Sequence, residues 1–132
     1  MDYYVGQSYE LVKTVTESDV YIFAGNCGDF NPVHLDQKYA ESTPFRGRIV
    51  HGALINSYIS TVLGMYMPGQ GTIYLSQESH FLKPVMIGDT VSINVEITDI
   101  NSKRRAHLKT VVRNQEGIVV LDGTAYVLLP PV

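Results

Sequence analysis

Hydrophobic and polar residues alternate along the second half of the chain, which predicts β-strands there. In the segment VSINVEIT at residues 91–98, every odd position is aliphatic and every even position is polar. A period of two is the pattern of a half-buried strand. Further strands are predicted at residues 73–81, from the turn at 101–103 through Val112, and at 118–129. The short turns between them favour antiparallel neighbours.

The first half of the chain predicts one strand and several helices. Residues 9–15 form the strand, and Thr16-Glu17-Ser18-Asp19 resembles a capped helix start. Val20, Phe23, Ala24 and Cys27 then recur at the spacing of one helix face, and Gly28 is a plausible stop. We therefore expect Cys27 to be a small buried hydrophobic residue. Residues 29–32 have loop chemistry, because Asn31 precedes a proline, and Asp36 could cap a short helix.

The segment from Ile49 to Gln77 contains no charged residue. Within it, apolar residues occupy nearly every side of a helical wheel, and Pro68-Gly69 ends the pattern. A helix that is apolar on most faces is buried. We therefore expect an α+β fold in which one antiparallel sheet wraps around a long central helix, as a single domain over residues 1–132. Open sheet edges are commonly paired with another chain, so we expect a homodimer or a higher homo-oligomer.

Composition narrows the classes of function. Hydrophobic residues make up 45% and charged residues 17%, so the chain can build a core. The net charge of −3 offers no basic excess for nucleic acid or an anionic membrane. The single cysteine fits a reducing compartment, and neither a signal peptide nor a membrane span is apparent. We expect a cytoplasmic protein without a nucleic-acid or membrane partner.

The densest polar cluster is the segment GDFNPVH, from Gly28 to His34. Its Asp29 and His34 are suitable types for an acid–base pair, and addition of water across a conjugated double bond needs two proton-handling groups. Asn31 could hold the water or orient one partner. On spacing alone, Asp29 could equally well cap a helix or close an Asx turn.

A second candidate is Gly52, which opens the predicted central helix after Val50-His51. A backbone N–H at a helix N-terminus is free, and the helix dipole favours negative charge there. It could stabilise the oxygen of an enolate-like thioester. The alternative is that Gly52 only permits close packing.

Together these motifs resemble the signature of the MaoC-like (R)-specific enoyl-CoA hydratases. The resemblance joins residues 28–36 and 49–52 and extends to residues 71–75 and 81–89. It implies a hot-dog fold, a homodimer, and reversible hydration of trans-2-enoyl-CoA to (R)-3-hydroxyacyl-CoA, with no metal or redox cofactor. Cys27 and Ala53 depart from residues common in the family and leave the acyl length open. The carrier of the acyl group, coenzyme A or acyl carrier protein, is also open.

Carried over residue by residue, the resemblance makes Asp29 and His34 the catalytic pair. It makes the N–H of Gly52 the group that binds the thioester carbonyl. Asn31 would support the loop, and Ser60, two helical turns after Gly52, would lie near the water and substrate. A serine on a buried helix more often bonds back to the backbone.

Other interpretations remain open at this point. A hot-dog thioesterase would direct water at the thioester carbonyl, and a binding module would keep the fold without turnover. A Cys27 nucleophile and a metal site at His34 and Asp36 have little support in the sequence. His51, His80 and His107 are expected to be structural or exposed. The basic residues are either a solvated surface or contacts for coenzyme A phosphates: Arg46, Arg48, Lys103, Arg104, Arg105 and Lys109.

Overall fold

A computed structural model describes residues 2–131 of the chain. Met1 and Val132, the ends of the domain predicted over residues 1–132, lie outside the described residues. The elements follow the order β1 (Ser8–Thr14), α1 (Glu17–Cys27), α2 (Pro32–Leu35), α3 (Gln37–Glu41), α4 (Gly52–Thr61), the π-helical turn η1 (Val62–Tyr66), β2 (Ile73–Phe81), β3 (Thr90–Ile100), β4 (Arg105–Arg113) and β5 (Val119–Leu128). All four predicted strands of the second half are confirmed, as is the strand near residues 9–15.

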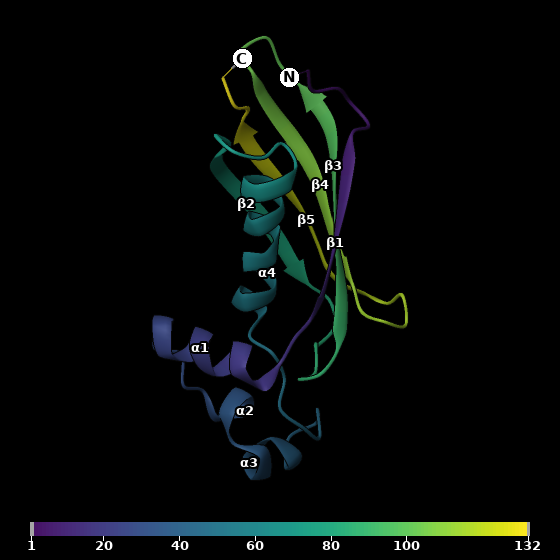
Figure 1. Ribbon diagram of the computed structural model, residues 1–132. Coiled ribbons are helices and arrows are strands. Elements are labelled where there is room, and N and C mark those ends of the chain that lie inside the picture. Colours follow the sequence, from purple (N-terminus) through teal and green to yellow (C-terminus); the bar gives the residue numbers. More distant parts are fainter. Residues whose placement is uncertain (1, 132) are drawn as a thin grey trace.

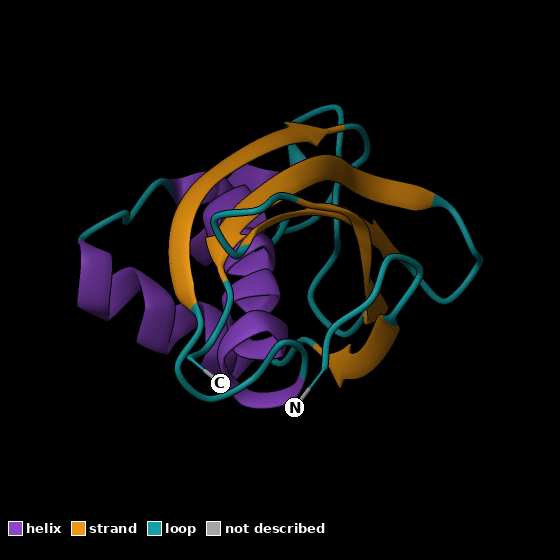
Figure 2. Ribbon diagram, turned by 90° about the horizontal axis from the view of Figure 1, so that it is seen from above, coloured by secondary structure: helices purple, strands orange, loops and turns teal. Residues whose placement is uncertain are grey.

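The five strands form one antiparallel sheet in the order β1-β3-β4-β5-β2. The sheet curves around α4, while α1, α2 and α3 lie together beyond the N-terminal end of that helix (Figures 1 and 2). This is the α+β, hot-dog architecture expected from the sequence. The arrangement places the loop before α4 next to the loop after α1, where the candidate residues lie.

The core fills the space between α4 and the sheet. The alternating residues of β3, Val91, Ile93, Val95 and Ile97, are all fully buried. They belong to one apolar cluster with Leu54, Ile55 and Ile59 of α4. Because side chains alternate between the two faces of a strand, every second side chain of β3 faces the helix.

Helix α1 begins and ends as predicted. Thr16 and Asp19 form a capping box, in which each side chain accepts a hydrogen bond from the other residue's backbone N–H. Gly28 ends the helix with φ 84°, a left-handed conformation that glycine adopts without steric cost. The expectation for Cys27 is wrong: Val20 and Ala24 are buried, but the cysteine is exposed. It is the last residue of α1, where residues 2–131 leave the apolar stripe uncovered.

Helix α4 is buried on one side only. Leu54, Ile55 and Ile59 face the core, whereas Ala53, Ser57 and Ser60 are exposed. Met65 in η1 is 72% exposed. The prediction of a helix covered on nearly all faces is therefore wrong for this single chain, because the sheet covers one flank and residues 2–131 contain no element that covers the opposite one. Among the described residues, no helix is long and apolar enough to cross a membrane.

Candidate active site

The side chain of Asp29 is oriented by the turn that follows α1. The backbone N–H of Asn31 donates to Oδ1 of Asp29 at 3.1 Å, which closes an Asx turn. The other oxygen, Oδ2, lies 4.0 Å from Nε2 of His51, and the Asp29 side chain is 50% exposed. The sequence suggested an Asx turn as an alternative to catalysis, and this turn is present. It uses only Oδ1, so Oδ2 is available to bind a water molecule.

His34 lies on the short helix α2, which begins at Pro32, the last residue of the loop expected over residues 29–32. Asn31 has φ −53° and ψ 124°, outside the helical region as expected before proline, and its Oδ1 accepts a hydrogen bond from the N–H of Val33 at 3.2 Å. Asn31 thereby caps α2, and Pro32 suits the first helical position because its missing N–H needs no partner there. The cap and the proline fix the direction in which His34 projects.

The ring of His34 is held in one tautomer. Its Nδ1 lies 2.7 Å from the carbonyl oxygen of Ile49. A carbonyl only accepts, so Nδ1 carries the proton in the neutral ring and Nε2 keeps its lone pair. Burial lowers the pKa of His34 below its ordinary value of 6.5, a neighbouring His51 lowers it further, and the bond to Ile49 and the charge of Asp29 oppose the shift. His34 is thus a neutral ring with one free basic nitrogen.

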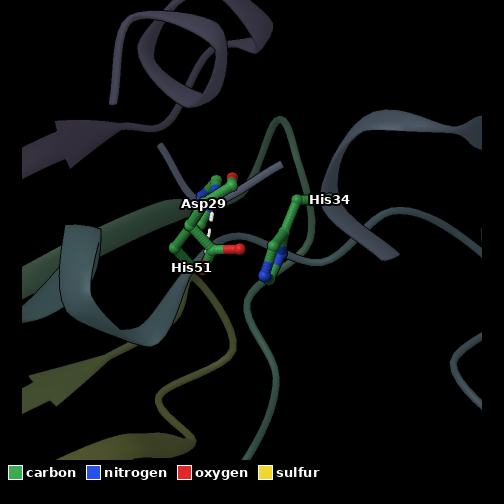
Figure 3. A group of neighbouring side chains, drawn as sticks. All are labelled: Asp29, His34 and His51. Atoms are coloured by element: carbon green, nitrogen blue, oxygen red, sulfur yellow. Dashed lines mark hydrogen bonds and ion pairs between the residues drawn. The ribbon is translucent and has the colours of Figure 1, made fainter. Parts of the chain in front are cut away.

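Asp29, His34 and His51 converge on one point, as Figure 3 shows. One carboxylate oxygen and one nitrogen from each ring lie within 4.8 Å of one another. A water that bonds two acceptors at ~2.8 Å with a tetrahedral angle spans about 4.6 Å between them. The spacing of the group therefore suits a single water molecule held between Asp29 and His34.

His51 is the residue of this cluster that sequence reasoning left out. It is 2% exposed, and its Nε2 lies 3.0 Å from the backbone oxygen of Asp29. Its ring stacks on that of His34, with centroids 3.8 Å apart. One signal was available: His51 lies in the uncharged segment predicted to be buried, where a polar side chain requires a hydrogen-bond partner.

Gly52 is the first residue of α4, so its N–H has no acceptor within the helix. It lines an apolar cavity of about 480 Å³ together with Phe45, Ala53, Phe81 and others. Neither Asp29 nor His34 lines that cavity. The acid–base pair and the cavity meet at the peptide between His51 and Gly52, which brings a free N–H beside both.

The remaining candidates lie farther away. Ser60 is exposed and about 12 Å along α4 from Gly52, at 1.5 Å per residue.

Asp36 caps α3 by accepting a hydrogen bond from the N–H of Tyr39. The group of possible metal ligands contains His51, whereas the sequence suggested Asp36 as the partner of His34. Arg48 pairs with Glu17 and donates to Tyr21, so it already has partners. His80 and His107 are exposed, as expected.

This chain is similar to one group of known proteins over most of its length. Residues 4–118 match the family model described as "MaoC like domain". An (R)-specific enoyl-CoA hydratase of Rhodospirillum rubrum is 43% identical over 125 residues, which cover 95% of this chain and 87% of that protein. A 3-hydroxybutyryl-CoA dehydratase of Methylorubrum extorquens is 42% identical over 129 residues, with 98% and 82% covered. The solved "(R)-hydratase from A. caviae involved in PHA biosynthesis" has a TM-score of 0.95 at 42% identity and covers 97% of this chain and 98% of that one.

Proposed function

This chain belongs to the MaoC-like domain family, and on that premise we propose that Asp29, His34 and Gly52 carry out its reaction. The chain is a hydro-lyase that adds water reversibly to trans-2-enoyl-CoA thioesters, giving (R)-3-hydroxyacyl-CoA. The observation that carries the residue roles is the convergence of Asp29 and His34 within 4.8 Å. A neutral imidazole and a half-exposed carboxylate at that distance supply the two proton-handling groups that hydration needs.

The reaction follows from this geometry. The N–H of Gly52 donates to the thioester carbonyl and draws electron density from the β-carbon. The water held between Asp29 and His34 attacks that carbon through its oxygen and gives up one proton to the pair. A proton from the pair reaches the α-carbon as the double bond is lost. The sum adds H and OH across the double bond, and the pair returns to its starting charge.

Asn31 and Ser60 act at a distance from the bond-making step in this proposal. Asn31 closes the turn of Asp29 and caps the helix of His34, so it fixes both members of the pair. Ser60 lies farther along α4 on the exposed side of the helix. We assign it to the substrate, beyond the reacting carbons.

The reaction needs no cofactor other than the coenzyme A of its substrate. Hydration leaves the oxidation level of the molecule unchanged, so no electron carrier takes part. Two ring nitrogens of the convergent group bond carbonyl oxygens, Nδ1 of His34 to Ile49 and Nε2 of His51 to Asp29. In each ring the nitrogen that bonds the carbonyl carries the proton, so the other nitrogen keeps its lone pair, and on His34 that lone pair serves as the base.

We also propose that the chain works as a homodimer in the cytoplasm. β2 is an edge of the sheet, and it carries the exposed apolar residues Ile73, Leu75 and Phe81. A long, apolar edge strand is normally paired or covered. The exposed thiol of Cys27 fits a reducing compartment. Mass measurement by light scattering after gel filtration tests the dimer, and a monomeric mass at micromolar concentration would contradict it.

The activity is tested by adding purified protein to crotonyl-CoA. Loss of the enoyl-thioester absorbance, without release of free thiol and with an (R)-3-hydroxy product, is the expected result. Release of thiol would instead identify a thioesterase. If crotonyl-CoA and longer and branched enoyl thioesters all remain unchanged, the result would favour a thioester-binding module without catalytic activity.

A further inference from the structure

His51 has one hydrogen bond, and that bond fixes its tautomer. Its Nε2 lies 3.0 Å from the backbone oxygen of Asp29, so Nε2 must be the donor. Its Nδ1 is buried and has no partner among residues 2–131. A second proton on Nδ1 would be a buried donor without an acceptor, which is costly. The donating nitrogen is therefore Nε2 in His51 and Nδ1 in His34, which are opposite tautomers.

The His51 ring packs against two other rings. One face stacks on His34 at a centroid distance of 3.8 Å and an interplanar angle of 26°. Phe23 of α1 lies at 5.0 Å with an angle of 57°. The side chain is 2% exposed, so it has little freedom to move. The buried ring therefore contacts one side chain of α1 and one of α2.

Three parts of the site meet at this one residue. The Nε2–H holds the backbone of Asp29, the ring face supports His34, and the peptide bond leads directly into Gly52. We propose that His51 is a positioning residue, which holds Asp29 and His34 at the separation where they share one water. It touches neither the substrate nor the transferred protons. This role rests on the proposed function of Asp29 and His34.

The hydrogen bond to Asp29 is the dominant link, because only that bond reaches the carboxylate residue. The carboxylate is half exposed, and its own turn fixes only Oδ1. Loss of the bond leaves the Asp29 backbone free to shift away from His34. A displacement of about 1 Å at a catalytic group can cost about 10²-fold in rate.

Two substitutions separate the bond from the ring. In H51Q the amide nitrogen can still donate to the Asp29 oxygen, whereas H51F keeps an aromatic ring without a donor. With crotonyl-CoA we expect H51F to lose about 10²-fold in kcat with KM little changed, and H51Q to stay within about fivefold of the original kcat. The matched control is H107F at an exposed histidine, with unchanged kcat and KM. A kcat for H51F near the original, or an equal loss in H51Q and H51F, would overturn the role.

Nitrogen NMR of the imidazole rings supplies a readout that does not depend on turnover. The unmodified protein should show the proton on Nε2 of His51 and on Nδ1 of His34. The His34 signal should persist in H51Q and exchange rapidly with water in H51F. A proton on Nδ1 of His51 overturns the role even if H51F fails to fold. If the proposed function fails, crotonyl-CoA is not hydrated, yet the two tautomers and their response to H51F are still observed.

Discussion

The ring of Phe81 lies directly against the α-carbon of Gly52. A Cβ added to Gly52 would stand 2.9 Å from Cε1 of Phe81, closer than such atoms approach in proteins. Phe81 is 57% exposed, so its ring can move, and both residues line the 480 Å³ cavity. The glycine thus serves close packing and keeps a free N–H beside the cavity, and the two interpretations of Gly52 are compatible.

Gly52→Ala should lower kcat/KM with crotonyl-CoA by about tenfold while the protein stays folded. The N–H remains, and alanine favours a helix over glycine by ~1 kcal/mol, but the displaced ring of Phe81 takes up space in the cavity. Steady-state kinetics and thermal unfolding measure both effects. The matched control is Gly25→Ala in α1, where an added Cβ meets nothing within 4 Å. Full activity in Gly52→Ala would mean that Phe81 yields without obstructing the substrate.

Asp29→Asn should reduce kcat by ~10²–10⁴-fold, the range for loss of a general acid or base. The new side chain can still accept the hydrogen bond from Asn31, so the turn and the fold are retained. Asp36→Asn is the matched control, because Asp36 only caps α3 and asparagine caps a helix equally well. Both variants are assayed with crotonyl-CoA at saturating concentration. Equal rates in the two would remove Asp29 from the mechanism.

The lowered pKa of His34 predicts how activity depends on pH. The neutral ring is the working form, so kcat/KM should hold as the pH falls past 6.5 and decline only near the lowered pKa. An acid limb centred above 6.5 would contradict this. The pH profile of kcat/KM, taken with a substrate that does not titrate in the range, is the measurement.

The free energy of unfolding should also depend on pH through the protonation of His34. Below pH 6.5 the unfolded chain binds a proton on His34 before the folded chain does. The free energy of unfolding should therefore fall as the pH drops from 6.5 to the lowered pKa, and level off below it for this group. Denaturant unfolding of the original protein and of His34→Gln at a series of pH values isolates this contribution. A parallel dependence in both proteins would show that other groups cause it.

Removal of divalent metal should leave activity unchanged. The free nitrogen of His34 accepts a proton in the proposed reaction, and the proposed proton transfers use no Lewis acid. Dialysis against EDTA, followed by the crotonyl-CoA assay and elemental analysis, checks this. Activity that disappears with EDTA and returns with one divalent ion would show that Asp29, His34 and His51 ligate a metal.

Local sequence patterns predicted the elements because their causes are local. The capping box of Thr16 and Asp19, the left-handed stop at Gly28 and the alternation along β3 each depend on residues within a few positions. The hot-dog architecture and the identity of the family came from a resemblance that joins distant segments. The helix ends, the strands and the overall architecture could therefore be predicted from the sequence.

Burial depends on tertiary contacts, and the wrong expectations lie there. Cys27 shares a helical face with Val20 and Ala24, yet it projects past the end of the covered surface. His51 was expected to be structural or exposed, and it is buried, but the sequence did not predict its contacts with Asp29 and His34, which lie 22 and 17 positions earlier in the chain. Such contacts have no signature in local spacing. The convergence of Asp29, His34 and His51 therefore exists only in the folded chain.

Substitution of Gly123 in β5 by alanine should destabilise the fold more than the same substitution at Gly64. An added Cβ would lie 2.1 Å from the carbonyl oxygen of Glu78 in β2. That oxygen belongs to the backbone of a paired strand, so it cannot move without separating β2 from β5. We expect Gly123→Ala to lower the free energy of unfolding by about 2–3 kcal/mol, typical of overpacking. Gly64→Ala, whose Cβ meets nothing within 4 Å, is the control in denaturant unfolding. Equal midpoints for the two variants would show that β2 and β5 can separate at little cost.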